Sequence, residues 1–574
     1  MRILLLCHSF NSLSQRLLTA LSALGHTLSV ELDISDSVTA QACALFQPDV
    51  LIAPFLKRRI AESVWRQWVC LVVHPGPPGD QGPAALDWAV LEQAPRWGVT
   101  VLQANADFDA GPVWAHAGFE VRAASKGSLY RFEVTQAAVN AVLQAVERLG
   151  AGARPWEDAP AHRWRPAMPQ MSRRIDWQQQ GTADILARLR SGDGQPGVLD
   201  ELFGLSCHLF DAHPATGTAL QRLAGVAPGA VVARRDGALL RRTVDGGVWL
   251  GQVRLPRACG DGAAFKLPAT MAFAAEAAAL PDWAVPLARE GDEWAELRYR
   301  ESGPAGARVG CLSFDFYNGA MSTGQCERLL QALQQVKQRD TRVLLLVGGR
   351  DFFSNGIHLN CIEAAAHQPD SSAADESWRN INAMNDLARE IIETTDRITV
   401  AVLRGNAGAG GVFLALAADE VWAHQGAVLN PHYRNMGNLY GSEYWTYLLP
   451  KRVGAACARQ IMLQRMPLSA AGAQQLGLVD RCLETRPDAF DEVVMAPALA
   501  MALTYNLSDR ILQKQQVRAD DEATRPLADY RKEELSRMHR NFYGFDPSYH
   551  VARYHFVHKV PHAWTPRHLA VHRS

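Results

Sequence analysis

The stretch RGNAGAGGVFLALAADEVWAH, residues 404–424, places a glycine-rich loop between an apolar run and a helical pattern. The run before it, ITVAVL at 398–403, is short and rich in β-branched residues, so it predicts a buried strand. Glycines at such a strand–helix junction let the backbone come close to another group, because no Cβ stands between them. A single loop of this kind is most often a plain turn, so its meaning depends on the sequence around it.

A second loop, GGRDFFSNGIHLN at 348–360, also follows an apolar run. Together the two loops resemble the two signatures of the enoyl-CoA hydratase/isomerase (crotonase) family, and the resemblance covers about residues 300–490. It implies that the backbone N–H groups of Ile357 and Gly410 polarise the carbonyl of an acyl-CoA thioester. Further residues that it places at the coenzyme A site are Gly356, Gly411 and Arg350.

Two positions depart from the pattern of the hydratases, which use two glutamates to add water across a double bond. These positions hold Phe413 and His432, and because Phe cannot transfer a proton, ordinary hydration is not expected. The loop that should cover the site contains Glu443, which we expect to transfer the proton, and Tyr433, its expected hydrogen-bonding partner. Alternatively, Glu443 caps the helix that starts beside it. Local hydrogen bonding is expected for His432, His358 and Asn355, and the alternative is that they face the cavity.

In the first part of the chain, short apolar runs alternate with helical patterns, which predicts a Rossmann-like parallel sheet covered on both faces. His74 ends one predicted strand, and Asp109 lies in the loop after the next one. Parallel sheets bind ligands beyond the carboxyl ends of their strands, so both residues are expected at that edge. A histidine with a nearby carboxylate can act as a general acid or base. The alternative is that both are ordinary turn residues.

The segments HPG at 74–76, GPAALDWAV at 82–90 and GVTVLQANADFDAGPVW at 98–114 resemble the formyltransferase family that uses formyl-tetrahydrofolate. The resemblance implies a formyl-tetrahydrofolate site with His74 and Asp109 as catalytic residues. The family also uses an Asn two residues before the His, but Val72 stands there. Another donor, such as a backbone N–H, would then have to stabilise the oxyanion. The alternative is an inactive folate-binding remnant.

The 574 residues suggest three to four domains at about 150 residues each. We expect an α/β multidomain protein, with short strand-like pieces forming a small β-rich, OB-like domain after the first sheet. A crotonase-like ββα spiral and C-terminal helices would follow. The expected boundaries are 1–165 for the formyltransferase-like domain, 166–290 for the β-rich domain, 296–500 for the crotonase-like domain and 501–574 for a helical extension.

The composition argues against several classes of partner. The net charge is −1, which gives no overall field to attract nucleic acid or an anionic membrane. The ten cysteines are scattered without a CxxC pair, as in reduced cytoplasmic proteins, and no run approaches the roughly 20 apolar residues of a membrane span. Residues 549–574 hold six of the 18 histidines, but without a clear metal-ligand spacing. We therefore expect a cytoplasmic protein without a metal site, in which these histidines pack between helices.

A formyl-folate half joined to a CoA-thioester half resembles the HypX/HoxX family of hydrogenase-maturation proteins over essentially the whole chain. FNSLSQRLL at 10–18, SNGIHLN at 354–360 and GSEYWTYLLPKRVG at 441–454 carry this resemblance. It implies that formyl passes from formyl-tetrahydrofolate to CoA, and that formyl-CoA is decarbonylated to carbon monoxide and CoA. The carbon monoxide would become the iron ligand of a NiFe hydrogenase, whose large-subunit precursor or maturation proteins are then the expected partners.

The chemistry of a formyl thioester agrees with this reading, because it has no α-carbon and so permits neither enolate formation nor hydration. Coenzyme A also needs cations for its phosphates. Besides Arg350, we expect Arg16 and Arg131 to supply them, unless they are solvated surface charges. Two other functions stay open: a transferase or hydrolase that releases no carbon monoxide, and a maturation scaffold that binds folate and CoA without turnover.

Overall fold

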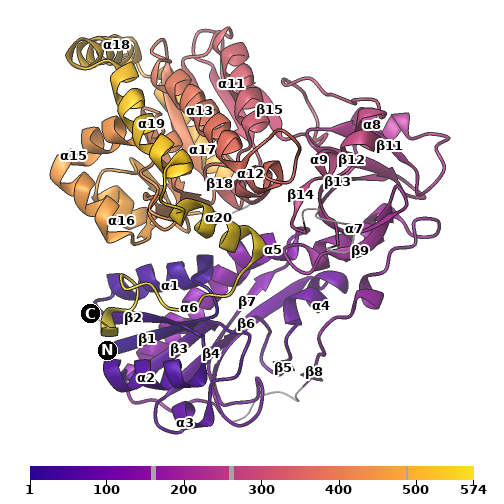
Figure 1. Cartoon of the computed structure of the whole chain (residues 1–574), viewed down its shortest axis with the longest axis vertical. Coiled ribbons are helices and arrows are strands. Elements are labelled where there is room, and N and C mark those ends of the chain that lie inside the picture. The colour runs from indigo at the N-terminus through magenta and orange to yellow at the C-terminus, as the bar shows by residue number, and fades with distance from the viewer. Residues whose placement is uncertain (157–162, 257–263, 486–488, 574) are drawn as a thin grey trace.

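The computed structural model describes residues 1–156, 163–256, 264–485 and 489–573, and it confirms the α/β multidomain class. The first sheet has the strand order β2-β1-β3-β4-β6-β7 (Figure 1). Its strands are β1 (Arg2–Cys7), β2 (Thr27–Leu32), β3 (Val50–Phe55), β4 (Cys70–His74), β6 (Arg96–Gln103) and β7 (Val113–Glu120). One face packs on α1 (Ser12–Ala23) and α6 (Thr135–Gly150), the other on α2 (Asp36–Phe46) and α3 (Glu62–Trp65).

The first sheet is mixed rather than wholly parallel. Strands β1 to β4 pair in parallel, whereas β6 runs antiparallel to β4, and β7 runs antiparallel to β6. The link between β6 and β7 is too short for the crossover that a parallel pair requires. The smaller elements nearby are β5 (Asp80–Gln81), α4 (Ala85–Leu91), α5 (Lys126–Leu129), a π-helical turn (Tyr130–Val134) and β8 (Arg163–Trp164).

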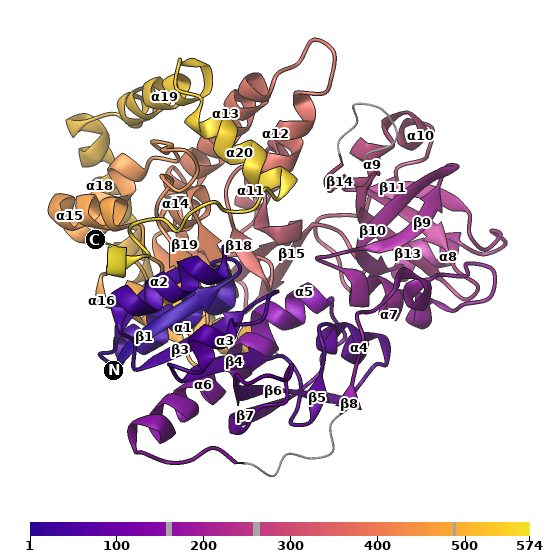
Figure 2. The ribbon, with the colours of Figure 1, turned by 60° about the horizontal axis from the view of Figure 1, so that its bottom comes forward.

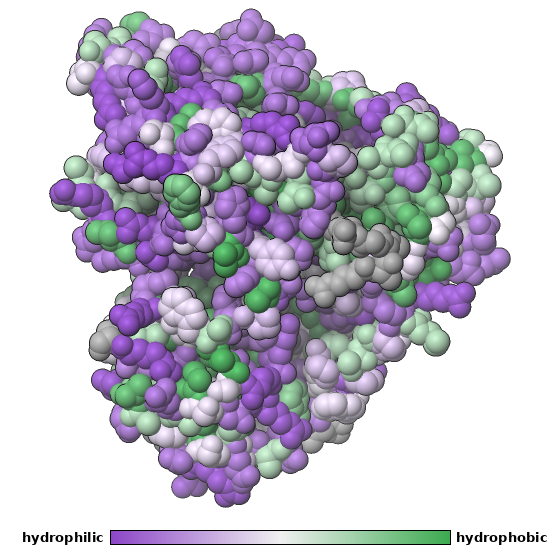
Figure 3. All heavy atoms as spheres, viewed as in Figure 1, coloured by the Kyte–Doolittle hydropathy of each residue, from purple (hydrophilic) through white to green (hydrophobic). Residues whose placement is uncertain are grey.

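The β-rich region forms an antiparallel sheet in the order β11-β12-β13-β10-β9, with β14 paired to β13. Its strands are β9 (Val198–Leu202), β10 (Leu205–Pro214), β11 (Val231–Arg235), β12 (Ala238–Arg242), β13 (Gly247–Arg254) and β14 (Leu267–Pro268). The short helices around it are α7 (Thr182–Gly192), α8 (Gly217–Arg222), α9 (Ala269–Ala272) and α10 (Ala274–Ala278). Hydrophilic side chains cover much of the molecular face in Figure 3, and hydrophobic ones gather over this sheet near α8.

The next region winds as a spiral that adds one strand to each of two sheets at every turn. The larger sheet has the order β15-β16-β17-β19-β21-β24, and the smaller one β18-β20-β22-β23. The strands are β15 (Leu297–Ser302), β16 (Val309–Phe314), β17 (Val343–Val347), β18 (Phe352–Ser354), β19 (Ile398–Leu403), β20 (Asn406–Gly408), β21 (Glu420–His424), β22 (Val428–Asn430), β23 (Leu468–Ser469) and β24 (Arg481–Leu483). The consecutive pairs β17–β18, β19–β20 and β21–β22 thus divide between the sheets, as expected for a crotonase-like spiral.

Helices cover this spiral, and a helical C-terminal segment packs back onto it. Those within the spiral are α11 (Thr323–Lys337), α12 (Leu359–Ala365), α13 (Ala373–Ile392), α14 (Gly410–Leu416), α15 (Trp445–Gln464) and α16 (Ala470–Gln475). They are followed by α17 (Phe490–Leu503), α18 (Leu507–Thr524), α19 (Leu527–Tyr543) and α20 (Ser548–His558). In the described part of the chain, no helix has the length and apolar character needed to cross a lipid bilayer.

The end of the chain returns to the first sheet and joins it to the spiral. The segment after α20 runs past the spiral to strand β2, so the two termini lie near each other (Figures 1 and 2). There the Val30 N–H donates to Leu569 O at 3.0 Å, and the Leu32 N–H donates to Thr565 Oγ1 at 2.9 Å. The C-terminal segment therefore links the two ends of the molecule that carry the predicted sites.

Candidate active sites

The first predicted site is built around His74, which lies between two carboxylates at the end of β4. Its Nε2 is 3.0 Å from Asp80 Oδ2, and its Nδ1 is 3.5 Å from Asp109 Oδ2. All three side chains are buried. The proximity of His74 and Asp109 was expected, but Asp80 was missed, because the turn-forming sequence HPGPPGD gave it the pattern of a loop residue.

Asp109 reaches His74 by a different route from the one expected. Since β6 is antiparallel to β4, its carboxyl end at Gln103 lies beside Leu71 rather than beside His74. The loop after β6 folds back, and Asp109 adopts a left-handed backbone conformation with φ +52°. The Gly82 N–H then donates to Asp109 Oδ2 at 3.1 Å. The expected proximity of His74 and Asp109 is found, but the expectation that they share one strand edge was wrong.

A cavity of about 360 Å³ opens at this site, lined by His74, Asp109, Val72 and Tyr130 among others. Its size and largely apolar lining suit a small organic ligand. Burial raises the pKa of Asp109, although the nearby His74 opposes this shift. On the other side of the ring, Arg165 Nε lies 2.9 Å from Asp80 Oδ1 and fixes that carboxylate. The arrangement can hold the imidazole in place and move a proton at either ring nitrogen.

The second predicted site holds Tyr433 and Glu443 in direct contact. The Tyr433 hydroxyl lies 2.5 Å from Glu443 Oε2, and both side chains are buried. Burial raises the pKa of Glu443 to about 7, although the hydrogen bond from Tyr433 opposes this. Phe413 stacks on the Tyr433 ring, with the centroids 5.3 Å apart. Glu443 thus combines a pKa near neutrality with a fixed orientation, as expected of a proton-transfer group.

The two predicted oxyanion donors lie next to this carboxylate. A Cβ placed on Gly356 would lie 3.4 Å from Gly410 N, so the two loops approach closely. A Cβ on Gly410 would clash with the Glu443 carboxylate, which explains why this position needs glycine. Within the residues that the structure describes, the N–H groups of Ile357 and Gly410 donate to no protein acceptor. They are available to bind a carbonyl oxygen beside Glu443.

Beside the oxyanion loop and Glu443, several residues other than glycine have positive φ values. Ala409, Glu443 and Tyr444 have φ values of +47°, +58° and +59°. Such conformations cost energy for residues other than glycine and concentrate at functional sites. The alternative role of Glu443 as a helix cap is excluded, because α15 begins at Trp445 and its N-cap, Tyr444, makes no side-chain cap.

Two residues that the sequence did not indicate hold this strained turn. On α13, Asn385 Oδ1 accepts from the Glu443 N–H at 2.8 Å. On α19, the Glu534 carboxylate accepts from the N–H groups of Tyr444 and Thr446 at 3.0 and 2.8 Å. No motif marked either residue, because each lies on a helix far from the turn in sequence.

The three predicted arginines gather between the first sheet and the spiral. Arg16 and Arg131 line a cavity of about 550 Å³, and Arg131 also lines a second cavity, of about 260 Å³, together with Arg350. Arg16 Nη1 donates to Gln425 O at 3.3 Å, and Arg131 pairs with Asp351 at 2.7 Å. Arg350 Nη1 is buried without a hydrogen-bond partner in the described residues, and burial lowers the pKa of this guanidinium. None of the three is a freely solvated charge.

Two of the remaining predicted residues make local hydrogen bonds, as expected. His358 caps α12, its Nδ1 accepting from the Cys361 N–H at 3.2 Å, and burial lowers the pKa of His358 to about 4. Asn355 Nδ2 donates to Asn318 O at 2.7 Å.

His432 does not meet that expectation, and Gly411, which was expected at the coenzyme A site, allows close packing of the backbone. The His432 ring is buried, and neither nitrogen has a partner among the described residues, so the expected local hydrogen bond is not found. Burial lowers the pKa of His432 to about 4, which keeps the ring neutral. A Cβ on Gly411 would clash with Ser354 O, so this glycine allows α14 to pack closely on β18. A contact of Gly356 or Gly411 with CoA stays a prediction.

Fold and sites together define a protein that joins a Rossmann-like α/β half to a crotonase-type half, with a buried acid–base group in each. The profile of the enoyl-CoA hydratase/isomerase family matches residues 316–566. The whole chain is 56% identical to the hydrogenase maturation factor HoxX of Bradyrhizobium diazoefficiens, covering 97% of that protein. The chain therefore belongs to the HypX/HoxX family of hydrogenase maturation factors.

Two further similarities agree with this assignment. The crystal structure of HypX from Aquifex aeolicus in complex with tetrahydrofolic acid is 43% identical, with a TM-score of 0.94 over 100% of this chain and 99% of that one. Enoyl-CoA delta isomerase 3 of Arabidopsis thaliana is 28% identical over 26% of this chain and 63% of its own length. The expected family and the crotonase-type region are thereby confirmed.

Proposed function

We propose that this chain transfers a formyl group from formyl-tetrahydrofolate to coenzyme A and then splits formyl-CoA into carbon monoxide and CoA. The carbon monoxide would serve the active-site iron of a NiFe hydrogenase, and the receiving partner would be the large-subunit precursor or another maturation protein. Membership of the HypX/HoxX family supports this setting. The tetrahydrofolic acid bound to the Aquifex aeolicus relative supports folate as the one-carbon carrier.

The first step takes place in the cavity beside His74. The CoA sulfur attacks the formyl carbon, a carbon–sulfur bond forms, and the bond from that carbon to the folate nitrogen breaks. His74 accepts the thiol proton and returns a proton to the folate nitrogen, while Asp80 and Asp109 orient its ring. Because Val72 has no side-chain amide, we assign the stabilisation of the oxyanion to a backbone N–H in this proposal.

The second step takes place beside Glu443. The N–H groups of Ile357 and Gly410 hold the formyl oxygen, and the Glu443 carboxylate removes the formyl hydrogen as a proton. The carbon–sulfur bond breaks, its electron pair leaves with the thiolate, and carbon monoxide departs. Glu443 then returns the proton to sulfur, so that CoA is regenerated. Tyr433 keeps the carboxylate in position through its hydrogen bond.

Arg16, Arg131 and Arg350 are proposed to bind the CoA phosphates between the two sites. They line two cavities at the interface of the halves, and Arg131 lines both. The half-buried Arg350 has a buried guanidinium nitrogen without a partner in the described chain, as expected of a cation that awaits an anionic ligand.

One observation carries this proposal furthest: a buried carboxylate with a pKa of about 7 lies against the Gly410 backbone and is oriented by Tyr433. Hydration needs two acid–base groups around a double bond, whereas decarbonylation of a formyl thioester needs one group that moves a single proton. The carboxylate that lies against Gly410 is that of Glu443, and Phe413 stands where the hydratase sequence pattern has a glutamate.

The proposal is tested by incubating the full-length protein with formyl-tetrahydrofolate and CoA and following carbon monoxide with haemoglobin. We expect E443Q to lower carbon monoxide release by at least about 100-fold while formyl-CoA still forms, because Gln cannot accept the proton. E327Q, which changes an exposed glutamate on α11, serves as the matched control. Unchanged release in E443Q removes Glu443 from the mechanism.

The same assay of the wild type separates the alternative functions. Formyl-CoA or formate without carbon monoxide supports a transferase or hydrolase, and ligand binding without turnover supports a scaffold.

A further inference from the structure

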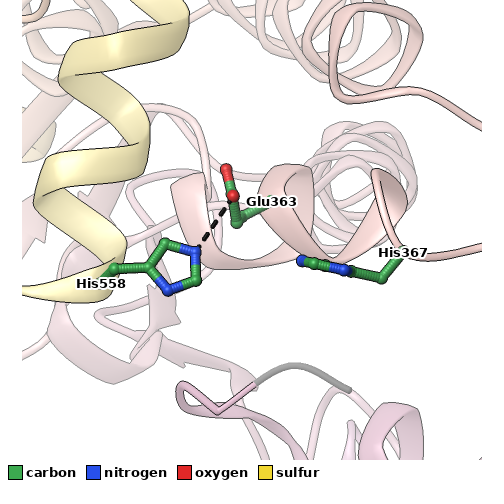
Figure 4. Close-up of side chains that lie close together, drawn as sticks. All are labelled: Glu363, His367 and His558. Carbon is green, nitrogen blue, oxygen red and sulfur yellow. Dashed lines mark hydrogen bonds and ion pairs between the residues drawn. The ribbon is translucent and has the colours of Figure 1, made fainter. Parts of the chain in front are cut away.

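A glutamate of α12, a histidine of the turn that follows α12 and a histidine of α20 lie close together (Figure 4). Glu363 lies on α12, His367 follows one helical turn later, and His558 is the last residue of α20. One side-chain donor atom of each residue lies within 4.8 Å of the donor atoms of the other two. The closest pair is Glu363 Oε1 and His558 Nε2, 3.1 Å apart.

The surroundings of Glu363 leave one of its oxygens facing the histidines. Arg553 Nε donates to Glu363 Oε2 at 2.7 Å, and both side chains are nearly buried. Arg553 thus fixes the carboxylate from outside the cluster, as hydrogen-bonding partners do for metal-binding carboxylates.

Imidazole nitrogens with a carboxylate oxygen form a donor set that suits Zn²⁺ and the neighbouring first-row divalent ions. Around a tetrahedral Zn²⁺, donor atoms lie about 3.4 Å apart, so the present cluster must contract slightly. His367 can provide this movement because its side chain is exposed at the end of α12. Glu363 and His558 already have a suitable separation and need not move.

We propose that Glu363, His367 and His558 bind a divalent transition-metal ion, best matched by Zn²⁺, with solvent completing its coordination. The ion joins α12 of the spiral to the C-terminal helix α20. Close to this point Tyr549 of α20 is hydrogen-bonded to Ser377 at 2.7 Å. Such a site is structural: it fastens the C-terminal segment that continues from α20 to the first sheet.

The simpler reading is that His558, Glu363 and Arg553 form an ion-pair network and that His367 stands beside it without a role. The variant H367A separates the two readings. It removes one proposed ligand from the exposed end of α12 and leaves the network of the other three residues intact. The matched control is H555A, which removes an exposed histidine of α20 outside the cluster.

The experiment uses the full-length protein, stripped of metal by a chelator and titrated with Zn²⁺ in a calorimeter and with Co²⁺ in an absorption spectrometer. We expect one Zn²⁺ to bind per chain in the wild type and in H555A, with the absorption bands of low-coordinate Co²⁺. H367A should weaken binding by at least about tenfold. Zn²⁺ should also raise the unfolding temperature of the wild type and of H555A more than that of H367A.

Two results would overturn the proposal: the absence of saturable binding in the wild type, or equal affinities and thermal shifts for the wild type and H367A. The His367 side chain is exposed, and its ring lies 6.3 Å from that of the buried Phe265, so H367A removes little packing and should fold even if H558A does not. H558A, where it folds, should lose the site as H367A does, and retention of wild-type affinity in H558A would likewise contradict it.

Discussion

At the scale of single residues, Glu443 predicts how carbon monoxide release depends on pH. Burial raises the pKa of this carboxyl to about 7, so it is protonated below that pH and ionised above it. Since the proposed step needs the ionised form, release from supplied formyl-CoA should increase as the pH rises through about 7. Y433F removes a hydrogen bond to the carboxylate and should move this rise upward by about one pH unit. The measurement is the initial rate of release across this range, and a flat profile, or one that falls with pH, contradicts the role.

Asp80 leads to a second prediction at this scale. D80N keeps the size of the side chain but removes the negative charge that pairs with His74 Nε2, which lies 3.0 Å from Asp80 Oδ2. We expect the rate of formyl-CoA formation to fall by roughly 10- to 100-fold while tetrahydrofolate still binds. The control is E92Q, which removes the more exposed of the two carboxylates that contact Arg165. Equal rates for D80N and E92Q would show that Asp80 does not position His74.

Single residues were predictable where a motif or a spacing marked them. The sequence paired His74 with Asp109 because both match the formyltransferase pattern. It paired Glu443 with Tyr433 because both lie in the loop expected to cover the second site. Asp80 was not, because Pro and Gly around it are typical of a turn. That His432 has no partner among the described residues could not be predicted either, since it depends on which groups from the rest of the chain surround the ring.

At the scale of secondary-structure elements, α19 supports the strained turn at Tyr444. Glu534 of α19 accepts hydrogen bonds from two backbone N–H groups there, and burial raises the pKa of Glu534 to about 8. E534A would leave these buried donors unpaired, which costs about 1–3 kcal/mol for each group left unsatisfied. We therefore expect a lower unfolding midpoint and slower carbon monoxide release in E534A, with a smaller effect in E534Q, which keeps one acceptor. If thermal unfolding and release are unaffected in E534A, α19 does not support the turn.

Apolar runs predicted the longer strands of both halves, and the two glycine loops were correctly expected to follow β17 and β19. The short strands β18 and β20 lie inside these loops and were not predicted. The direction of β6 and β7 was not predicted, because an apolar run does not state which way its strand pairs with a neighbour. The contacts of α13 and α19 with the Glu443 turn were also missed. They depend on tertiary packing between segments far apart in sequence, for which hydrophobic periodicity gives no signal.

At the scale of the whole molecule, the interface between the halves should bind CoA. Arg350 is half-buried there, and its buried Nη1 has no hydrogen-bond partner among the described residues. R350A should raise the KM for CoA by about tenfold, since a charge-assisted hydrogen bond contributes roughly 1.5–3 kcal/mol, and should leave the KM for formyl-tetrahydrofolate unchanged. R96A changes an exposed arginine of the first sheet and is the control. A KM for CoA equal to that of R96A would place the phosphates elsewhere.

The joint architecture also explains why one chain carries both sites. The C-terminal segment packs on the spiral and hydrogen-bonds to β2 of the first sheet, so the two halves are held in a fixed relation. Arg131 of the first half pairs with Asp351 of the spiral at 2.7 Å, on the wall shared by both interdomain cavities. This arrangement suits the proposed reaction sequence, in which CoA receives the formyl group beside His74 and formyl-CoA is split beside Glu443.

The most direct test follows one labelled carbon through the intact protein. Formyl-tetrahydrofolate that carries ¹³C in its formyl group is supplied with CoA, and the gas released is analysed by infrared spectroscopy or mass spectrometry. The account predicts ¹³C-labelled carbon monoxide that depends on CoA and is lost in both H74A and E443Q. Label found only in formyl-CoA or formate, or carbon monoxide formed without CoA, would contradict it.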